Sequence, residues 1–128
     1  MPVFNFVGIV VRSIEESLAF YRLLGVEVGQ SDGGPHHQVA LPNGMNLAWD
    51  TVALMRELDG EWHEPTGHRM GLGFQCESPA EVDRVYAEVT GAGYTGKKAP
   101  WDAFWGQRYA QLTDPDGNTV DLFATLPA

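Results

Sequence analysis

The chain has 128 residues, of which 44% are hydrophobic and 20% are charged, a balance typical of one soluble globular domain. The 8 Lys and Arg residues face 17 Asp and Glu residues, which gives a formal net charge of −9. A chain this acidic repels phosphate backbones and anionic lipid, so neither nucleic acid nor a membrane is an expected partner.

The N-terminal sequence and the cysteine content indicate where the protein works. MPVFNFVGIVV has neither the basic start nor the cleavage site of a signal peptide. No apolar run approaches the roughly 20 residues that span a bilayer. We therefore expect a cytoplasmic protein. The single cysteine, Cys76, excludes an internal disulfide and a Cys-rich zinc site, and its strand-like setting indicates a buried small side chain.

The first half of the chain predicts a strand, a helix and then two strands joined by a hairpin. FVGIVV (residues 6–11) is strand-like, and Ser13-x-x-Glu16 predicts the capping box of an amphipathic helix that stops at Gly25. Pro42-Asn43-Gly44 is a hairpin signal. It lies between strands expected near residues 38–41 and 45–50.

The second half repeats this pattern of a strand, a capped helix and further strands. GLGFQC is strand-like, Ser78-x-x-Glu81 predicts a second capping box, and Gly91 supplies the stop. Asp114-Pro115-Asp116-Gly117 is a strong turn signal between strands near residues 108–113 and 119–124. The segment from Asp59 to His68 has the composition of a linker.

These patterns predict an α+β domain over residues 1–128, built from two βαβββ modules. Module one covers about residues 1–58, the linker about 59–68, and module two about 69–128. A repeat this short cannot bury its sheet alone, so we expect the two copies to combine, within one chain or between chains.

PWDAFWGQRYA (residues 100–110) concentrates bulky aromatics in what the pattern predicts to be a loop that enters a strand. Trp101, Phe104 and Trp105 expose too much apolar area there unless something covers them. This segment is therefore a candidate wall of a binding site.

The duplicated module that ends in DPDGNTVDLFA resembles the glyoxalase/bleomycin resistance/dioxygenase superfamily, also called vicinal oxygen chelate proteins. The resemblance covers essentially the whole chain. It implies cup-shaped mixed sheets that form a cleft, commonly in a homodimer with exchanged modules.

The superfamily's enzymes bind a divalent metal through four strand positions, and the resemblance places these on Phe6, about Leu47, Gly71 (Met70 if the register slips) and Asp121. Only Asp121 is a plausible ligand, and such ions need three or more. His68 lies two or three residues from the third position, and the other histidines are in loops. We therefore expect neither a metal ion nor another cofactor.

Alternation along strands predicts which side chains line the cleft. The predicted set is Phe6, Gly8, Val10, Leu47, Trp49, Gly71, Gly73, Gln75, Thr119, Asp121 and Phe123. Glycines make room and aromatics make apolar walls, which suits a flat apolar ligand. For Phe6, Leu47, Trp49 and Phe123, packing in a dimer core is an open alternative.

A closer resemblance is to the mitomycin-binding resistance proteins and related proteins that sequester quinone or enediyne drugs. It rests on NLAWDTV, EW..PTGHR, PWDAFWGQRYA and DPDGNTVDLFA. It implies that a planar drug lies between His36 (or His37) and Trp105. Trp101 and Phe104 would enclose it, and Gln107, Tyr109 and Asp121 would supply polar edges.

These observations lead to a main hypothesis and two alternatives. The main one is a non-catalytic homodimer that confers self-resistance by sequestering a flat aromatic antibiotic. The first alternative is an enzyme of the same superfamily, a metal-dependent or metal-free lyase, isomerase or oxygenase, in which Asp121 or a histidine acts as base. The second is a cleft that serves only dimerisation.

Overall fold

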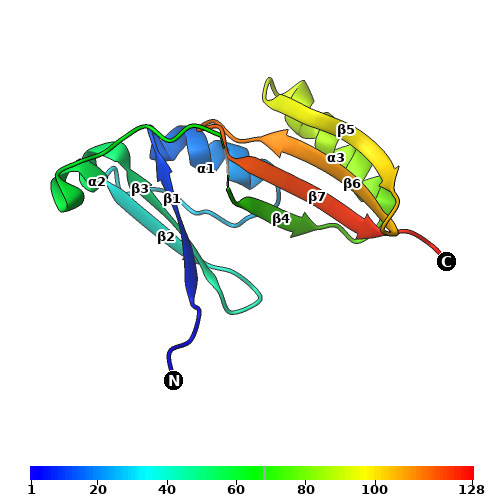
Figure 1. The fold of residues 1–128 in the computed structure, drawn as a ribbon, viewed down its shortest axis with the longest axis horizontal. Coiled ribbons are helices and arrows are strands. Elements are labelled where there is room, and N and C mark those ends of the chain that lie inside the picture. The colour runs from blue at the N-terminus through cyan, green and yellow to red at the C-terminus, as the bar shows by residue number, and fades with distance from the viewer. Residues whose placement is uncertain (68) are drawn as a thin grey trace. The chain divides into compact units, whose positions relative to one another are not determined.

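The computed structural model describes residues 1–67 and 69–128. It divides into two compact units, Met1–Glu64 and Pro65–Ala128, each with a mixed sheet and its own helices (Figure 1). The expected α+β class and the duplicated module are confirmed. His68, which the sequence places near a metal-ligand position, lies outside the described residues. Within those residues no helix is long and apolar enough to cross a bilayer.

The first unit contains a three-stranded sheet in the order β1-β3-β2. β3 lies in the centre, parallel to β1 and antiparallel to β2. Its elements are β1 (Phe6–Val11), α1 (Ile14–Leu23), β2 (His36–Ala40), β3 (Asn46–Thr51) and α2 (Val52–Asp59).

This unit keeps the β-α-β-β part of the repeat but departs from it at two places. Residues 24–35, which precede β2, contain no strand, because Gly29 and Gly33 adopt left-handed backbone conformations that interrupt an extended chain. The second departure is α2, which the sequence did not predict. Thr51 begins it by accepting a hydrogen bond of 3.1 Å from the N–H of Leu54, and Gly60 ends it.

The second unit contains the complete module, with a four-stranded sheet in the order β4-β7-β6-β5. α3 packs against β5, β6 and β7, as Figure 1 also shows. The elements are β4 (Gly71–Gln75), α3 (Pro79–Gly91), β5 (Thr95–Ala103), β6 (Gln107–Thr113) and β7 (Thr119–Thr125).

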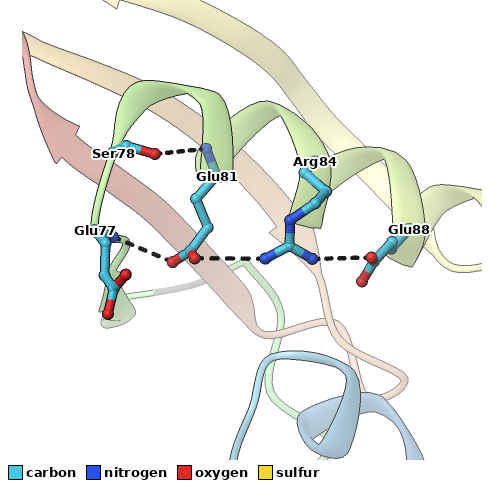
Figure 2. Close-up of polar contacts among 5 residues, drawn as sticks. All are labelled: Glu77, Ser78, Glu81, Arg84 and Glu88. Carbon is cyan, nitrogen blue, oxygen red and sulfur yellow. Dashed lines mark hydrogen bonds and ion pairs between the residues drawn. The ribbon is translucent and has the colours of Figure 1, made fainter.

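Serine side chains cap α1 and α3, as predicted. Ser13 and Ser78 each accept a hydrogen bond of 3.2 Å from the backbone N–H three residues on. At α3 the carboxylate of Glu81 also accepts from the N–H of Glu77, and Arg84 links Glu81 to Glu88 along the helix (Figure 2). These contacts satisfy amide groups that a helix start leaves unpaired.

Both predicted helix stops and both predicted turns have counterparts in the structure. Gly25 follows α1 with φ of 89°, as expected, but Gly91 is still helical, and Gly93, with φ of 99°, stops α3 instead. Gly44 and Gly117 adopt left-handed conformations in the two turns. The sequence therefore locates these chain reversals correctly, apart from the two-residue shift at α3.

In the second unit, the core lies between α3 and one face of the sheet. Val120, Leu122 and Ala124 of β7 alternate toward the helix and are at most 1% exposed, and Val82 and Val89 of α3 are fully buried. Among the described residues of the second unit, no helix lies on the opposite face of this sheet, and the candidate site lies there.

Candidate functional site

The side chains of β4, β5, β6 and β7 that point away from α3 form what we call the open face. Residues paired across neighbouring strands share a face of a sheet, so the pairing defines this set in rows. One row is Trp101, Tyr109, Phe123 and Gln75, and the next is Lys98, Gln111, Asp121 and Gly73. A third contains Thr113, Thr119 and Gly71.

Aromatic rings occupy one end of the open face in continuous contact. The ring centroid of Tyr109 lies 5.5 Å from that of Trp101, 5.2 Å from that of Trp105 and 6.3 Å from that of Phe123. The Phe123 ring is nearly parallel to that of Tyr109, with an interplanar angle of 23°. Phe104 is 97% exposed and Trp105 is 48% exposed. The predicted cluster of aromatics therefore exists and presents a large apolar surface.

Trp105 lies in a tight turn rather than in a long loop. The N–H of Gly106 donates to the carbonyl of Ala103 at 3.1 Å, and Gly106 takes a φ of 89°, as in a hairpin closed by a turn and a left-handed residue. The indole N–H of Trp105 donates to Gln107 Oε1 at 2.8 Å and fixes the ring. The expectation that Trp101 lies in a loop is wrong, because β5 extends to Ala103.

β5 reaches this far in spite of Pro100 because it is an edge strand. Its pairing with β6 is irregular between Lys98 and Trp101. Proline cannot donate to a ladder, so it is tolerated at an edge and at such irregularities. The strand therefore continues past Pro100, and Trp101 lies on the open face.

A polar cluster lies beside the aromatic rings. The hydroxyl of Tyr109 donates to Asp121 Oδ2 at 2.5 Å, and the amide of Gln111 donates to Asp121 Oδ1 at 3.1 Å. Burial, together with the hydrogen bond to Asp121 and its charge, raises the pKa of Tyr109 to about 12, so the phenol stays protonated. Gln111 was not predicted, although strict alternation from Tyr109 would have found it.

Two lysines of β5 add positive charge to the open face. The Lys98 ammonium lies 3.9 Å from the centroid of the Trp101 ring, a cation–π contact. The Lys97 ammonium donates a hydrogen bond of 2.9 Å to Thr119 Oγ1. The face thus combines the cluster of aromatic rings with the carboxylate of Asp121 and the ammonium groups of Lys97 and Lys98.

In the first unit, the face predictions hold for β1 but fail for β3. Ile9 and Val11 are buried, and Phe6, 54% exposed, shares the other face with Gly8 and Val10, as expected. Phe6 pairs with Asn46, however, so Leu47 and Trp49 lie on the side opposite to Phe6. Their placement in the cleft is wrong.

Trp49 is instead part of the core of the first unit. Its indole N–H donates to Ser17 Oγ on α1 at 3.0 Å, and its ring lies edge-on to Tyr21 at 5.9 Å. Both Trp49 and Leu47 are buried. The pairing of Gly8 with Ala48 and of Gly73 with Asp121 makes Ala48, not Leu47, the counterpart of Asp121.

The two adjacent histidines of β2 have different environments. His36 is exposed, and its Nδ1 lies 2.5 Å from Asp50 Oδ1. His37 is partly buried, its Nε2 donates to the carbonyl of Val28 at 2.6 Å, and its ring contacts Trp49. His37 therefore serves the core of the first unit, and His36 is the one of the pair with an exposed ring.

The donor chemistry does not fit the divalent metal that the fold family implies. The four strand positions carry Phe6, Ala48, Gly71 and Asp121, so one carboxylate stands where three or more ligands are needed. Across residues 1–67 and 69–128, no group of three His, Cys, Asp or Glu side chains could hold an ion.

Comparison with known proteins agrees with the observed fold. Residues 3–122 match the family model described as the glyoxalase/bleomycin resistance protein/dioxygenase superfamily. No curated protein matches.

Among solved structures, a glyoxalase/bleomycin resistance protein/dioxygenase from Nocardioides is 25% identical, with a TM-score of 0.79 over 100% of this chain and 86% of that one. A protein of unknown function from Agrobacterium tumefaciens is 26% identical, with a TM-score of 0.73 over 98% and 95% of the two chains. A glyoxalase/bleomycin resistance protein/dioxygenase family enzyme from Burkholderia phytofirmans is 23% identical, with a TM-score of 0.81 over 96% and 98%, and shows the shared fold.

Proposed function

The chain belongs to the glyoxalase/bleomycin resistance protein/dioxygenase superfamily, and from this premise we propose that it is a non-catalytic binding protein that sequesters a flat aromatic or quinone antibiotic. The proposed result is self-resistance, because a bound drug cannot reach its target. The observation that carries the proposal is the cluster of aromatic rings at one end of the open face, in which Tyr109 contacts Trp101, Trp105 and Phe123.

The physics of stacking supports this ligand class. Quinones and anthraquinones are flat and electron-poor, and an indole face such as that of Trp105 attracts them. Each aromatic pair contributes roughly 0.5–1.5 kcal/mol beyond area burial. Burial of a fused ring system adds about 25 cal/mol per Å² of apolar surface. The indole N–H bond to Gln107 supports affinity because it fixes the Trp105 ring before the ligand arrives.

The wider site is part of the same proposal. The exposed ring of His36, restrained by Asp50, is the proposed second stacking partner. Exposed apolar side chains such as Phe6 and Phe104 support a homodimer, because surfaces of this kind are normally covered. Sedimentation of the protein is expected to give twice the chain mass, and a monomer at micromolar concentration contradicts the dimer.

The experiment that tests the function is a titration with mitomycin C and an anthraquinone-fused enediyne. Tryptophan fluorescence is expected to be quenched to saturation at a fixed stoichiometry. Intact drug should be recovered on denaturation, as shown by mass spectrometry. Trp105→Ala is expected to weaken binding at least tenfold, roughly the effect of losing one buried aromatic contact. An unchanged affinity of Trp105→Ala would contradict the proposal.

The enzymatic alternative has a different outcome in the same experiment. A lyase, isomerase or oxygenase converts its ligand, so the recovered mass or its isomer pattern changes with time and one protein molecule acts many times. Asp121 is the side chain that such chemistry would use, and Tyr109 and Gln111 restrain it. Turnover that disappears in Asp121→Asn would replace sequestration as the function.

A further inference from the structure

Asp121 is the acidic side chain of the open face, on the strand that lies between β4 and β6. Its oxygens accept hydrogen bonds from Tyr109 at 2.5 Å and Gln111 at 3.1 Å. An ionised carboxylate offers about four lone-pair sites. After these two bonds, each oxygen can accept one more hydrogen.

On the β4 side of Asp121, the sheet carries no side chains in two successive open-face positions. A Cβ atom at Gly71 would lie 3.8 Å from Asp121 Oδ2, and one at Gly73 would lie 3.5 Å from the Phe123 ring. Both glycines are exposed. The backbone of β4 is thus a flat floor, bordered by the carboxylate at one position and by an aromatic edge at the next.

We propose that the ligand is a flat aromatic molecule with a hydroxyl or N–H donor on one ring edge, which it donates to Asp121 while its ring lies over Gly71 and Gly73 beside Phe123. This rests on the proposed function and names the ligand chemistry of the same face. Asp121 and Phe123 are two residues apart on β7, a spacing of roughly 6.5–7 Å. One fused ring system can therefore span both.

The carboxylate selects a donor over an acceptor. A ligand carbonyl or ether oxygen against Asp121 would place two acceptors together and leave the carboxylate desolvated without a new partner. Tyr109 cannot relieve this, because its hydroxyl stays protonated at neutral pH and already donates its hydrogen bond to Asp121. A donor on the ligand instead becomes a charge-assisted hydrogen bond.

The test compares matched probes on the intact protein. One anthraquinone is used as its hydroxyl and O-methyl forms, at a pH at which the hydroxyl is protonated, and a second is used as its primary amine and dimethylamine forms. The donor form of each pair is expected to bind about tenfold or more tightly than its methylated form, as for a hydrogen bond to a charged group. A preference in only one pair identifies that group, hydroxyl or N–H, as the donor.

Two variants show which residue causes the preference for the donor form of each probe. In Asp121→Asn it is expected to fall below about threefold, while Tyr109→Phe, which keeps the carboxylate, is expected to retain it. Equal affinities within both pairs for the wild-type protein overturn the inference, and this comparison needs no variant to fold. If Trp105→Ala still weakens both members of a pair, the proposed function stands without the inference. If no member binds to folded protein, both fail.

Discussion

The indole N–H of Trp49 donates a hydrogen bond of 3.0 Å to the hydroxyl of Ser17, and neither side chain is exposed. The bond joins β3 to α1 inside the first unit. Trp105, by contrast, is 48% exposed on a turn of the second unit. The sequence predicts a place in the binding face for both tryptophans, but only Trp105 has the exposure that such a role needs.

The contrast predicts that truncation of Trp49 lowers stability far more than truncation of Trp105. Trp49→Ala is expected to lower the free energy of unfolding by about 3–5 kcal/mol, because it empties a buried site. Ser17→Ala is expected to cost about 1–3 kcal/mol, because the indole N–H loses its partner. Trp105→Ala should cost less than about 1 kcal/mol, since its ring is half exposed. Urea denaturation measures all three, and a Trp49→Ala protein of normal stability would show that Trp49 is outside the core.

The faces of some strands could be predicted from sequence, and those of others could not. In β7, buried Val120, Leu122 and Ala124 alternate with Thr119, Asp121 and Phe123, so the period of two assigns the faces correctly. In β3, Leu47, Ala48 and Trp49 are consecutive and all apolar, and all three are buried. Periodicity cannot choose a face there. The pairing with β1 and the hydroxyl of Ser17 decide it, and both depend on tertiary structure.

Helix caps could be predicted from neighbouring residues alone, whereas the length of one strand could not. The caps at Ser13 and Ser78 were predictable because capping needs only residues within one turn of the chain. The extent of β5 through Pro100 was not, because it depends on the strand being at a sheet edge. The cluster of aromatic residues was predictable from the sequence. The hydrogen bond from Tyr109 to Asp121 was not, because it joins two strands and forms only in the folded sheet.

Gly96 predicts a stability effect that depends on one neighbour. A Cβ atom at this position would overlap the hydroxyl of Tyr86 and lie 3.1 Å from Thr90 Cγ2, both on α3. Gly96→Ala is therefore expected to destabilise by about 1–3 kcal/mol, as overpacking does. Combined with Tyr86→Ala, the same change should cost much less, because the overlapping ring is gone.

The matched control for Gly96 is Gly91→Ala. A Cβ atom there meets nothing within 4 Å, and the residue is helical. Alanine should be neutral or should stabilise by up to about 1 kcal/mol. Thermal or urea unfolding of the four variants measures the set, and an additive double variant would contradict a direct clash between Gly96 and Tyr86.

The two histidines of β2 predict separable effects. His37→Ala is expected to destabilise by about 1–3 kcal/mol, since the carbonyl of Val28 loses its donor and Trp49 loses a ring contact. His36→Ala should change stability by less than about 1 kcal/mol, because its half-exposed ring makes one polar contact, with Asp50, and such contacts at the surface contribute little. In ligand titrations His36→Ala is expected to weaken binding. Normal affinity in His36→Ala would remove this residue from the site.

The pKa of Tyr109 predicts how stability depends on alkaline pH. Its folded value of about 12 lies above the ordinary value of 10.0, so the folded state holds the phenolic proton more tightly. The resulting stabilisation is fully present below about pH 10 and is lost as the pH rises toward about 12. The difference in unfolding free energy between wild type and Tyr109→Phe should therefore shrink over this range. Cys76 is present in both proteins, so its own titration cancels, and a difference independent of pH would contradict the assignment.

Gly73 predicts that binding can be blocked without loss of the fold. The residue is exposed on β4, and a Cβ atom there makes only ordinary contact with the Phe123 ring at 3.5 Å. Gly73→Val should leave stability unchanged or raise it, because valine suits a strand better than glycine. Its methyl groups would occupy the space over β4 beside Asp121, so affinity for the planar probes is expected to fall at least tenfold, roughly the cost of displacing one well-packed ring contact.

The matched control is Gly8→Val, which makes the same change on β1. A Cβ atom there also lies 3.5 Å from a phenylalanine ring, that of Phe6. Fluorescence titration of both variants shows whether one sheet or both take part, and full affinity in Gly73→Val would exclude the open face as the binding site.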